Sequence, residues 1–558
     1  MEYLFLAVTI LALVVLYAIK CLAEEKSAKK KIVKKLYEDY GKSFAKEYPP
    51  GRLDTIAGYH NRRNKENVID DITWNDLDMD RIFKSMDFTF SAAGEEALYA
   101  TLRCPEVEEE ILTEREKRIV YFMEHADERV KLQLLFAKIG RTGRYSMFDY
   151  LDYLEVLPDR KNFKHYLGIA LLVGSVIFMG FQFEMGFFLF LLCSVVNMLL
   201  YFRDKAEISA YISTFSYFIR LLDSLSGFIK AEIPVIEKET KVFLAIRQKF
   251  QKFIRFSWIV TVDSGLSSNP LALFGEYGKM VLHLDLIKFN RMLRHIRENK
   301  KELIIAIGTL GEIERDIAVG AYRRSLSNFC VPQFLGMGTR KVHMQEAYHP
   351  LLENPVCNSF REEKSMLLTG SNASGKSTFL KTVAINVILA QTIHTCAATE
   401  YSAGMFRILS SMSLRDDLAG GNSYFMVEIK SLKRILDVIR QTSVPVICFV
   451  DEVLRGTNTV ERIAASTEIL KSLRSDNSMC FAATHDIELT ELLEKEYDNY
   501  HFEETIVEND VRFNYRLKNG KATTRNAIRL LAVLGYEDTI IEKAEERAER
   551  FVNDGIWS

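Results

Sequence analysis

A glycine-rich octapeptide ending in lysine and serine is the stretch of this sequence whose residue types and spacing best suit chemistry. Residues 370–377 read Gly-Ser-Asn-Ala-Ser-Gly-Lys-Ser and match G-x-x-x-x-G-K-[ST]. An apolar run, Met366–Thr369, precedes it, and a helix-forming stretch, Thr378–Ile393, follows. Between a strand and a helix, such glycines let backbone N–H groups surround phosphate oxygens at the helix start. The pattern predicts an ATP-binding loop made of Gly370, Ser371, Asn372, Ala373, Ser374, Gly375, Lys376, Ser377 and Thr378.

A second apolar run ends in two carboxylates. Val446–Val450 is followed by Asp451 and Glu452. Buried parallel strands end at the edge of the sheet where α/β proteins bind ligands. Asp451 is therefore predicted to hold Mg²⁺ together with Ser377, and Glu452 to act as general base on the attacking water. A strand ending in surface acids is the alternative, but it is the weaker reading downstream of a phosphate-binding loop.

A third apolar run places a histidine at the same predicted edge. Cys480–Thr484 reads as a buried strand, and His485 follows it. His485 would sense or position the γ-phosphate, although a lone histidine is often structural. Lys376 would reach the terminal phosphates. The predicted catalytic residues are thus Glu452, Lys376 and His485.

These motifs and their flanks resemble the MutS family of ATPases, a branch related to ABC ATPases. The resemblance covers roughly residues 340–550. It rests on Asn372 in the loop, His349–Leu352, Asp416–Ala419 with Ser423–Glu428, Asp451–Thr457, Ala483–His485 with Glu488–Thr490, and the tail Thr524–Lys543. Upstream, Phe90–Pro105 looks like the start of the family's helical core, and the helices of 275–330 look like its levers.

The resemblance implies a fold and a mode of assembly. An α/β P-loop (ABC-like) ATPase domain would follow an all-α core/lever domain, and ATP and Mg²⁺ would be its cofactors. Ser423 of one subunit would complete the ATP site of the other, so a homodimer with composite sites is expected. The family's mismatch-recognition domain is expected to be lacking. Ser371, Ala373, Ser374 and Leu454 depart from the family's usual residues, so turnover and subunit contacts are expected to differ.

Two apolar stretches predict three membrane helices. Tyr3–Ile19 is uncharged and long enough for one span, and lysines follow it from Lys20 onward. A cleaved signal peptide would want a basic start, whereas this chain starts Met1-Glu2. The second stretch, Tyr166–Phe202, breaks at Gln182–Glu184 and predicts a hairpin of helices over about 166–181 and 185–202. A buried hairpin of a soluble protein is the alternative.

The flanking charges predict the orientation of these spans. Lys161 and Lys164 precede the hairpin, and Arg203 and Lys205 follow it. Basic residues favour the cytoplasmic side, which places Glu184 across the membrane. The expected location is a cell membrane crossed three times, with membrane lipid as a partner and the ATPase domain cytoplasmic. The expected division is an anchor over 1–22, helical regions over 23–165 and 203–335 around the hairpin 166–202, and the ATPase domain with a dimerisation tail over 336–558.

Composition gives little further guidance on partners. Lys+Arg number 73 and Asp+Glu 75, so net charge offers no argument for nucleic-acid binding. A local basic row could still bind DNA, and the alternative is a solvated helix face; its members are Lys241, Arg247, Lys249, Lys252 and Arg255. The eight cysteines include no C-x-x-C pair, which argues against zinc or a redox motif and indicates buried, reduced thiols.

The sequence leaves two functional hypotheses open. The favoured one is a membrane-anchored, dimeric, MutS-type ATPase that binds DNA in repair or recombination, an analogy that the family alone supplies. The alternative is an ATP-driven membrane mechanochemical or scaffold device that does not bind DNA, since the hairpin interrupts the helical region. A degenerate, inactive ATPase is disfavoured because Lys376, Asp451, Glu452 and His485 are all present.

Overall fold

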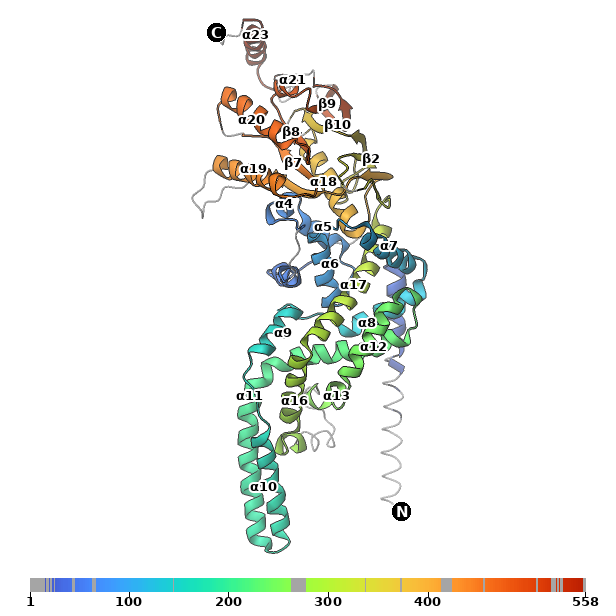
Figure 1. Cartoon of the computed structure of the whole chain (residues 1–558), viewed down its shortest axis with the longest axis vertical. Helices are drawn as coiled ribbons and strands as arrows, with labels where there is room; N and C mark the ends of the chain where they lie inside the picture. The colour runs from blue at the N-terminus through green and yellow to red at the C-terminus, as the bar shows by residue number, and fades with distance from the viewer. Residues whose placement is uncertain are drawn as a thin grey trace.

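The protein is elongated, with an α/β domain at one end, a helical core in the middle and a two-helix hairpin at the other end (Figure 1). The computed structural model describes residues 16, 20, 23–24, 26–42, 46–62, 67–143, 145–261, 277–336, 338–371, 374–412, 424–454, 457–507, 510–522, 528, 531 and 535–554. The predicted N-terminal span, Tyr3–Ile19, lies almost wholly outside these residues. It stays a prediction, as do the domain boundaries.

A six-stranded sheet in the order β10-β9-β4-β8-β7-β6 forms the centre of the α/β domain. Its strands are β4 (Ser365–Thr369), β6 (Arg407–Ser411), β7 (Val446–Asp451), β8 (Ser478–Ala483), β9 (Tyr497–Val507) and β10 (Asp510–Asn519). All neighbours are parallel except β9 and β10, which form a hairpin. The three strands predicted from apolar runs are confirmed, and β4, β7 and β8 end at one edge of the sheet.

A second sheet and several helices cover this centre. The second sheet, in the order β1-β5-β2-β3, consists of β1 (Gln333–Phe334), β2 (Val342–Ala347), β3 (Asn358–Glu362) and β5 (Glu400–Ala403). The helices are α18 (Lys376–Ile393), α19 (Tyr424–Gln441), α20 (Thr459–Leu473) and α21 (Leu489–Leu492), and α23 (Asp538–Asp554) projects beyond them (Figure 1). The α/β architecture predicted for this part of the chain is therefore confirmed.

The helical core is built around two helices that pack closely, α6 (Ala92–Arg103) and α17 (Lys300–Ser325). Every residue of α6 is buried. Gly311 of α17 allows the close approach, because a Cβ there would lie 2.5 Å from the carbonyl oxygen of Ala93. The surrounding helices are α2 (Arg52–Ile56), α3 (Gly58–Asn61), α4 (Asp71–Asp76), α5 (Met79–Met86), α7 (Glu109–Glu124), α8 (Ala126–Ile139), α9 (Met147–Val156), the 3-10 turn η1 (Pro234–Ile236), α12 (Glu237–Lys249), α13 (Gln251–Ile254), α14 (Trp258–Thr261) and α16 (Leu284–Glu298).

The apolar hairpin consists of α10 (Phe163–Met179) and α11 (Phe183–Lys230). Two helices with a break at Gln182–Glu184 were predicted, and both are present, although α11 already begins at Phe183. The second helix does not end near Phe202 as predicted, but continues into the helical core, where it packs on α8 and α12. Within the hairpin, Asn197 of α11 donates to Gly168 O of α10 at 3.2 Å.

The hairpin exposes most of its apolar side chains. Within the described residues, Phe183–Ser209 is the one helix long and apolar enough to cross a bilayer, judged by length and composition alone. Its most apolar window has a mean hydropathy of 2.2, and 17% of that window is buried. A core helix of a soluble protein would be mostly buried. The shorter α10 has 17 residues, so it is about 25 Å long against a hydrocarbon core of about 30 Å.

Side chains of the helical core satisfy the buried C-terminal end of α18. The last carbonyls of a helix have no partner within the helix and must find one elsewhere. Gln391 O accepts from Glu106 N at 2.8 Å, and Thr392 O accepts from the guanidinium of Arg115 on α7. Arg323 of α17 donates to His394 O at 2.7 Å and forms two further bonds to Glu116. We call this group, made of Glu106, Arg115, Glu116, Arg323, His394 and the end of α18, the α18 joint.

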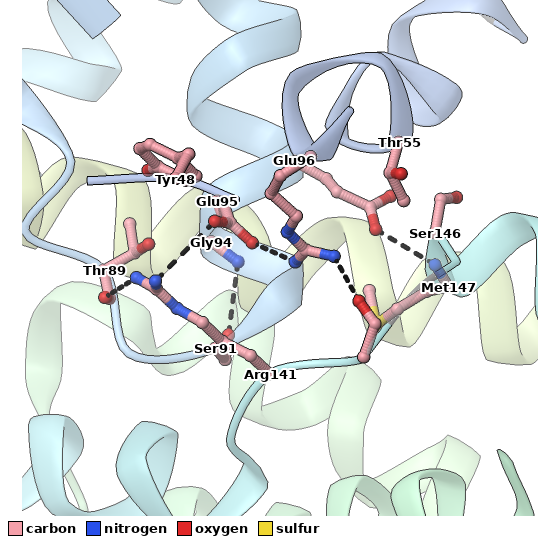
Figure 2. A network of polar contacts seen from close by, with 12 residues as sticks. Tyr48, Thr55, Thr89, Ser91, Gly94, Glu95, Glu96, Arg141, Ser146 and Met147 are labelled. Carbon is pink, nitrogen blue, oxygen red and sulfur yellow. Dashed lines mark hydrogen bonds and ion pairs between the residues drawn. The ribbon is translucent and has the colours of Figure 1, made fainter. Parts of the chain in front are cut away.

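A buried polar network ties the start of α2 to α6 and to the loop after α8 (Figure 2). Arg52 donates to Glu95 Oε2 at 2.5 Å and to Gly143 O at 2.9 Å. Arg141 donates to Thr89 O at 2.6 Å and lies 3.7 Å from Glu95 Oε1. Figure 2 shows Glu96 reaching the backbone N–H of Met147, a bond of 3.0 Å. Charged groups inside this core are therefore mostly paired, as burial requires.

Glu96 is the least well compensated member of the network. Its Oε2 is buried and has no hydrogen-bond partner among the described residues. Burial raises the pKa of Glu96 to about 8, and it raises the pKa values of Glu95 and Glu314 to about 7. Between the ordinary and the raised pKa, the folded protein binds more protons than the unfolded chain. Stability from these groups is therefore present at low pH and is lost as pH rises toward 8.

Replacing Glu96 with Gln should flatten this pH dependence. Glu96→Gln carries no ionisable proton, so the loss of stability from pH ~5 to ~8 should shrink by up to about 1.4 kcal/mol per pH unit. Thermal unfolding midpoints of wild type and variant across that range measure the effect. The exposed Glu110→Gln is the matched control and should follow wild type. A Glu96→Gln profile parallel to wild type would contradict a buried, protonated Glu96.

Candidate nucleotide-binding site

The loop between β4 and α18 has the backbone that a phosphate-binding loop needs. Gly370 has φ 142° and Gly375 has φ 106°, conformations that residues with a Cβ rarely adopt. A Cβ on Gly370 would also lie 2.8 Å from Phe502 O. Gly375 is the N-cap of α18, so the positive end of the helix dipole faces the loop. The predicted residues Gly370, Ser371, Ser374, Gly375, Lys376, Ser377 and Thr378 all lie in this loop and the first turn of α18.

Lys376 folds back over the loop. Its Nζ donates to Gly370 O at 2.8 Å and to Ser371 O at 2.9 Å, and it lies 3.4 Å from His485 Nε2. An ammonium held by neutral carbonyls can exchange them for phosphate oxygens, which are the stronger acceptors. Lys376 and His485, 109 residues apart in sequence, are thus brought together as predicted.

The two predicted Mg²⁺ ligands lie side by side. Ser377 Oγ donates to Asp451 Oδ2 at 2.5 Å. Both are hard oxygen donors at the edge of the phosphate loop, and Mg²⁺ typically takes one or two such ligands together with phosphate oxygens and water. No cluster of three His, Cys, Asp or Glu side chains occurs in the described part of the chain. The residues present therefore fit an ion that arrives with a nucleotide rather than an all-protein metal cage.

Glu452 and His485 form a close pair at the ends of β7 and β8. His485 Nε2 lies 2.7 Å from Glu452 Oε1. Glu452 has φ 57°, an uncommon conformation for a residue with a side chain, and its N–H donates to Ala483 O at 2.9 Å. The backbone of β8 thus helps to fix the carboxylate beside the phosphate loop. All three predicted catalytic side chains meet within one site.

A cavity of about 480 Å³ opens from the phosphate loop toward β3 and the β9–β10 hairpin. Besides the loop and Glu452, its lining includes His349, Leu352, Val356 and Tyr515. Burial lowers the pKa of His349 to about 4, so its ring is neutral at physiological pH. The cavity therefore offers apolar and aromatic surface next to a phosphate site, as a nucleotide requires.

Two residues of this site were not found from the sequence. Tyr515 has φ 53°, and its ring lies over the loop, since a Cβ on Gly375 would be 3.1 Å from Tyr515 Cδ1. Glu504 of β9 accepts from Ser371 Oγ at 2.9 Å. Both come from the β9–β10 hairpin, and the ladder is irregular between Phe513 and Leu517. An aromatic residue in a strand usually indicates packing, so no sequence signal marked Tyr515.

Some predicted site residues cannot be placed. Asn372, Ala373 and Ser423 lie outside the described residues, as do Arg455 and Gly456. The composite site that Ser423 would complete therefore stays a prediction.

The backbone conformation and the burial of Leu454 show how this residue, one of the expected departures from the family's pattern, is accommodated. It has φ 59°, a conformation that costs a residue with a Cβ about 1–2 kcal/mol and costs glycine little. The side chain is nevertheless buried, at 4% exposure, and the backbone N–H donates to the carboxylate of Glu428. Apolar burial offsets the strain at a position where the related proteins usually have glycine.

Comparison with known proteins supports the assignment of this part of the chain. Residues 366–552 match the family model described as MutS domain V. The chain is similar to the DNA mismatch repair protein MutS of Thermotoga maritima, 29% identical over 273 residues, which is 47% of this chain and 33% of that protein. It is also 32% identical over 246 residues to the DNA mismatch repair protein MutS of Pseudothermotoga lettingae, covering 42% of this chain and 30% of that protein. The chain thus spans about a third of the length of these relatives. Residues 366–552 are thus similar to a MutS ATPase domain, in agreement with the resemblance of the motifs.

Tyr515 should contribute to nucleotide affinity through its ring. Tyr515→Ala is expected to weaken binding of a non-hydrolysable ATP analogue by about 1–3 kcal/mol, the usual value of stacking a base on an aromatic side chain. Tyr515→Phe keeps the ring and should bind as wild type does. Isothermal titration calorimetry measures both affinities. Equal affinity of the Ala variant and wild type would show that the ring does not contact the base.

Proposed function

We propose that this protein is a dimeric, membrane-anchored ATP hydrolase of the MutS type, with DNA as its first candidate target. One observation carries the proposal: residues from three separate segments meet at one edge of the sheet. These are Lys376 and Ser377 of α18, Asp451 and Glu452 at the end of β7, and His485 after β8. Each is of the type that phosphoryl transfer to water needs at that place.

The roles of these residues follow from their contacts. Lys376 would bind the terminal phosphates in place of its two loop carbonyls. Ser377 and Asp451 would hold Mg²⁺, which neutralises charge on the phosphate oxygens. Glu452 would accept the proton of the attacking water. His485, whose Nε2 lies 2.7 Å from Glu452 Oε1, would orient this carboxylate and contact the terminal phosphate.

The dimer rests on the likeness of residues 366–552 to MutS domain V. In the proposed assembly, Ser423 of each subunit faces the ATP bound by the other, so ATP draws the two α/β domains together and hydrolysis releases them. The sheet edge that carries Glu452 must then be accessible to a second subunit.

DNA as the target comes from the names of the relatives, which are DNA mismatch repair proteins. The predicted basic row lies exposed on α12, on α13 and at Arg255 just after it. Two of its five members are paired with acids: Lys241 lies 2.7 Å from Glu237, and Lys249 contacts Glu302. The row is therefore less basic than its sequence indicates, and it supports DNA binding only weakly.

A membrane device without DNA is the second candidate, and α11 favours it. This single helix belongs both to the exposed apolar hairpin and to the helical core. Movement of the core on ATP binding would be transmitted to the hairpin without an intervening loop. The expected location is a cell membrane, with the ATPase domain on the cytoplasmic side.

Glu452→Gln should separate ATP binding from hydrolysis. Loss of the general base is expected to lower turnover by about 10²–10⁴-fold, while ATP still binds and holds the dimer closed. Phosphate release and size-exclusion chromatography with ATP measure the two effects. Glu488→Gln, an exposed acid nearby, should leave both unchanged. Unaltered turnover in Glu452→Gln would remove Glu452 from the mechanism.

A DNA target predicts that DNA stimulates turnover in a salt-dependent way. Turnover of the detergent-solubilised protein should rise with duplex or branched DNA, and the rise should fade as salt increases, because phosphate contacts release counterions. Turnover indifferent to every DNA at every salt concentration would reject the DNA target and leave the membrane device.

Membrane insertion predicts opposite accessibility for the two ends of the hairpin. Glu184→Cys, in a background with Cys21, Cys193, Cys330 and Cys357 changed to Ser, should react with an impermeant maleimide only from the side opposite the ATPase domain. Lys161→Cys in the same background should react only from the ATPase side. Labelling of both positions from one side would contradict a hairpin that crosses the bilayer.

A further inference from the structure

Two cysteines that are far apart in sequence face each other beside the α18 joint. Cys330 follows α17, Cys396 follows α18, and the two residues form an isolated antiparallel bridge. Each backbone N–H donates to the other's carbonyl oxygen, both at 3.0 Å. Residues in such a pair have Cα atoms about 5.5 Å apart, within the range that a disulfide spans. Both cysteines are free thiols in this structure.

The two thiols differ in the way that a reacting pair requires. Cys330 is partly exposed, and its contact with Cys396 and the nearby Arg323 lower the pKa of its thiol. Cys396 is fully buried, its Sγ donates to Asn386 O at 3.6 Å, and burial raises the pKa of its thiol. An accessible thiol of lowered pKa next to a second thiol is the arrangement that favours oxidation to a disulfide.

We propose that Cys330 and Cys396 form a reversible disulfide that slows the ATPase. The oxidant is hydrogen peroxide. The Cys330 thiolate attacks one peroxide oxygen, which breaks the O–O bond and gives a sulfenic acid at Cys330. The displaced hydroxide takes up the proton that the Cys330 thiol had lost and leaves as one water. The Cys396 thiol then attacks the sulfenic sulfur, the S–S bond forms, and the displaced hydroxyl leaves with the thiol proton as a second water. Two electrons pass from the two sulfurs to the peroxide, and a dithiol reductant reverses the change.

The place of this bond in the fold indicates its effect. Cys396 lies two residues after His394, whose carbonyl Arg323 of α17 binds, and Cys330 lies just beyond the end of α17. A disulfide would thus lock the end of the phosphate-loop helix to the exit of α17. Movement between the α/β domain and the helical core would be restricted, while the nucleotide cavity at the other end of α18 stays open. This effect on turnover rests on the proposed hydrolase activity, whereas disulfide formation does not.

Peptide mapping of the full-length protein tests the bond itself. After treatment with hydrogen peroxide and alkylation, a cross-linked peptide containing Cys330 and Cys396 is expected, and dithiothreitol should remove it. Cys448 and Cys480 are the internal control, because they are neighbours in β7 and β8 and both are fully buried. They should stay reduced. Alkylated or over-oxidised Cys330 without the cross-link would overturn the proposal, as would equal cross-linking of the control pair.

Turnover measurements test the consequence. Peroxide should lower turnover of the wild type by on the order of fivefold or more, with ATP affinity unchanged, and dithiothreitol should restore it. Cys330→Ser should not respond to peroxide, whereas Cys357→Ser, which removes an exposed cysteine elsewhere, should respond as wild type does. A cross-linked protein with full turnover, or an equal loss in Cys330→Ser, would overturn the regulatory effect. Absence of turnover in the reduced wild type would refute the proposed hydrolase instead, and the mapping would still decide the disulfide.

Discussion

The buried end of the phosphate-loop helix is the constraint on which the arrangement of the protein depends. A helix that starts at the nucleotide and ends inside the molecule leaves several carbonyl oxygens without partners in the helix. Here α7, α17 and the segment before α7 supply those partners, through Arg115, Arg323 and the backbone of Glu106. The α/β domain and the helical core are therefore joined by directional, buried hydrogen bonds, so that one end of α18 adjoins the glycine-rich loop and the other meets the core.

Charged groups inside the helical core are also held by buried contacts, but they are less completely paired. Lys46 and Tyr48, before α2, donate to Asp87 between α5 and α6, while Arg52 of α2 and Arg141 approach Glu95 of α6. Residues 46–52 are therefore held to this part of the core mainly through buried carboxylates. Burial raises the pKa of Asp87 to about 6, despite these donors. Such groups add little net stability, because desolvation offsets much of their attraction. They do fix which surfaces meet, since removing one partner leaves a buried charge unpaired.

Local sequence signals predicted the parts of the site that local chemistry determines. The loop at Gly370–Ser377 and the acids after β7 were identifiable because motif, apolar run and helix start lie within a few residues of one another. Tyr515, the α18 joint and the pairing of Cys330 with Cys396 depend on contacts between distant segments, which periodicity does not encode. The continuation of α11 was missed for a different reason: hydropathy falls after Phe202, but a change of polarity does not interrupt backbone hydrogen bonds. The anchor at Tyr3–Ile19 and the role of Ser423 remain predictions.

The unbroken course of α11 has a geometric consequence for the hairpin. Because no loop separates the apolar part of the helix from the part that packs on α8 and α12, the two parts share one rotational phase. Each residue added or removed between them would turn the hairpin by about 100° and shift it by about 1.5 Å. The number of residues in this stretch therefore fixes the direction in which each face of the hairpin points relative to the helical core. The length of this stretch of α11 is therefore more tightly constrained than its amino-acid composition.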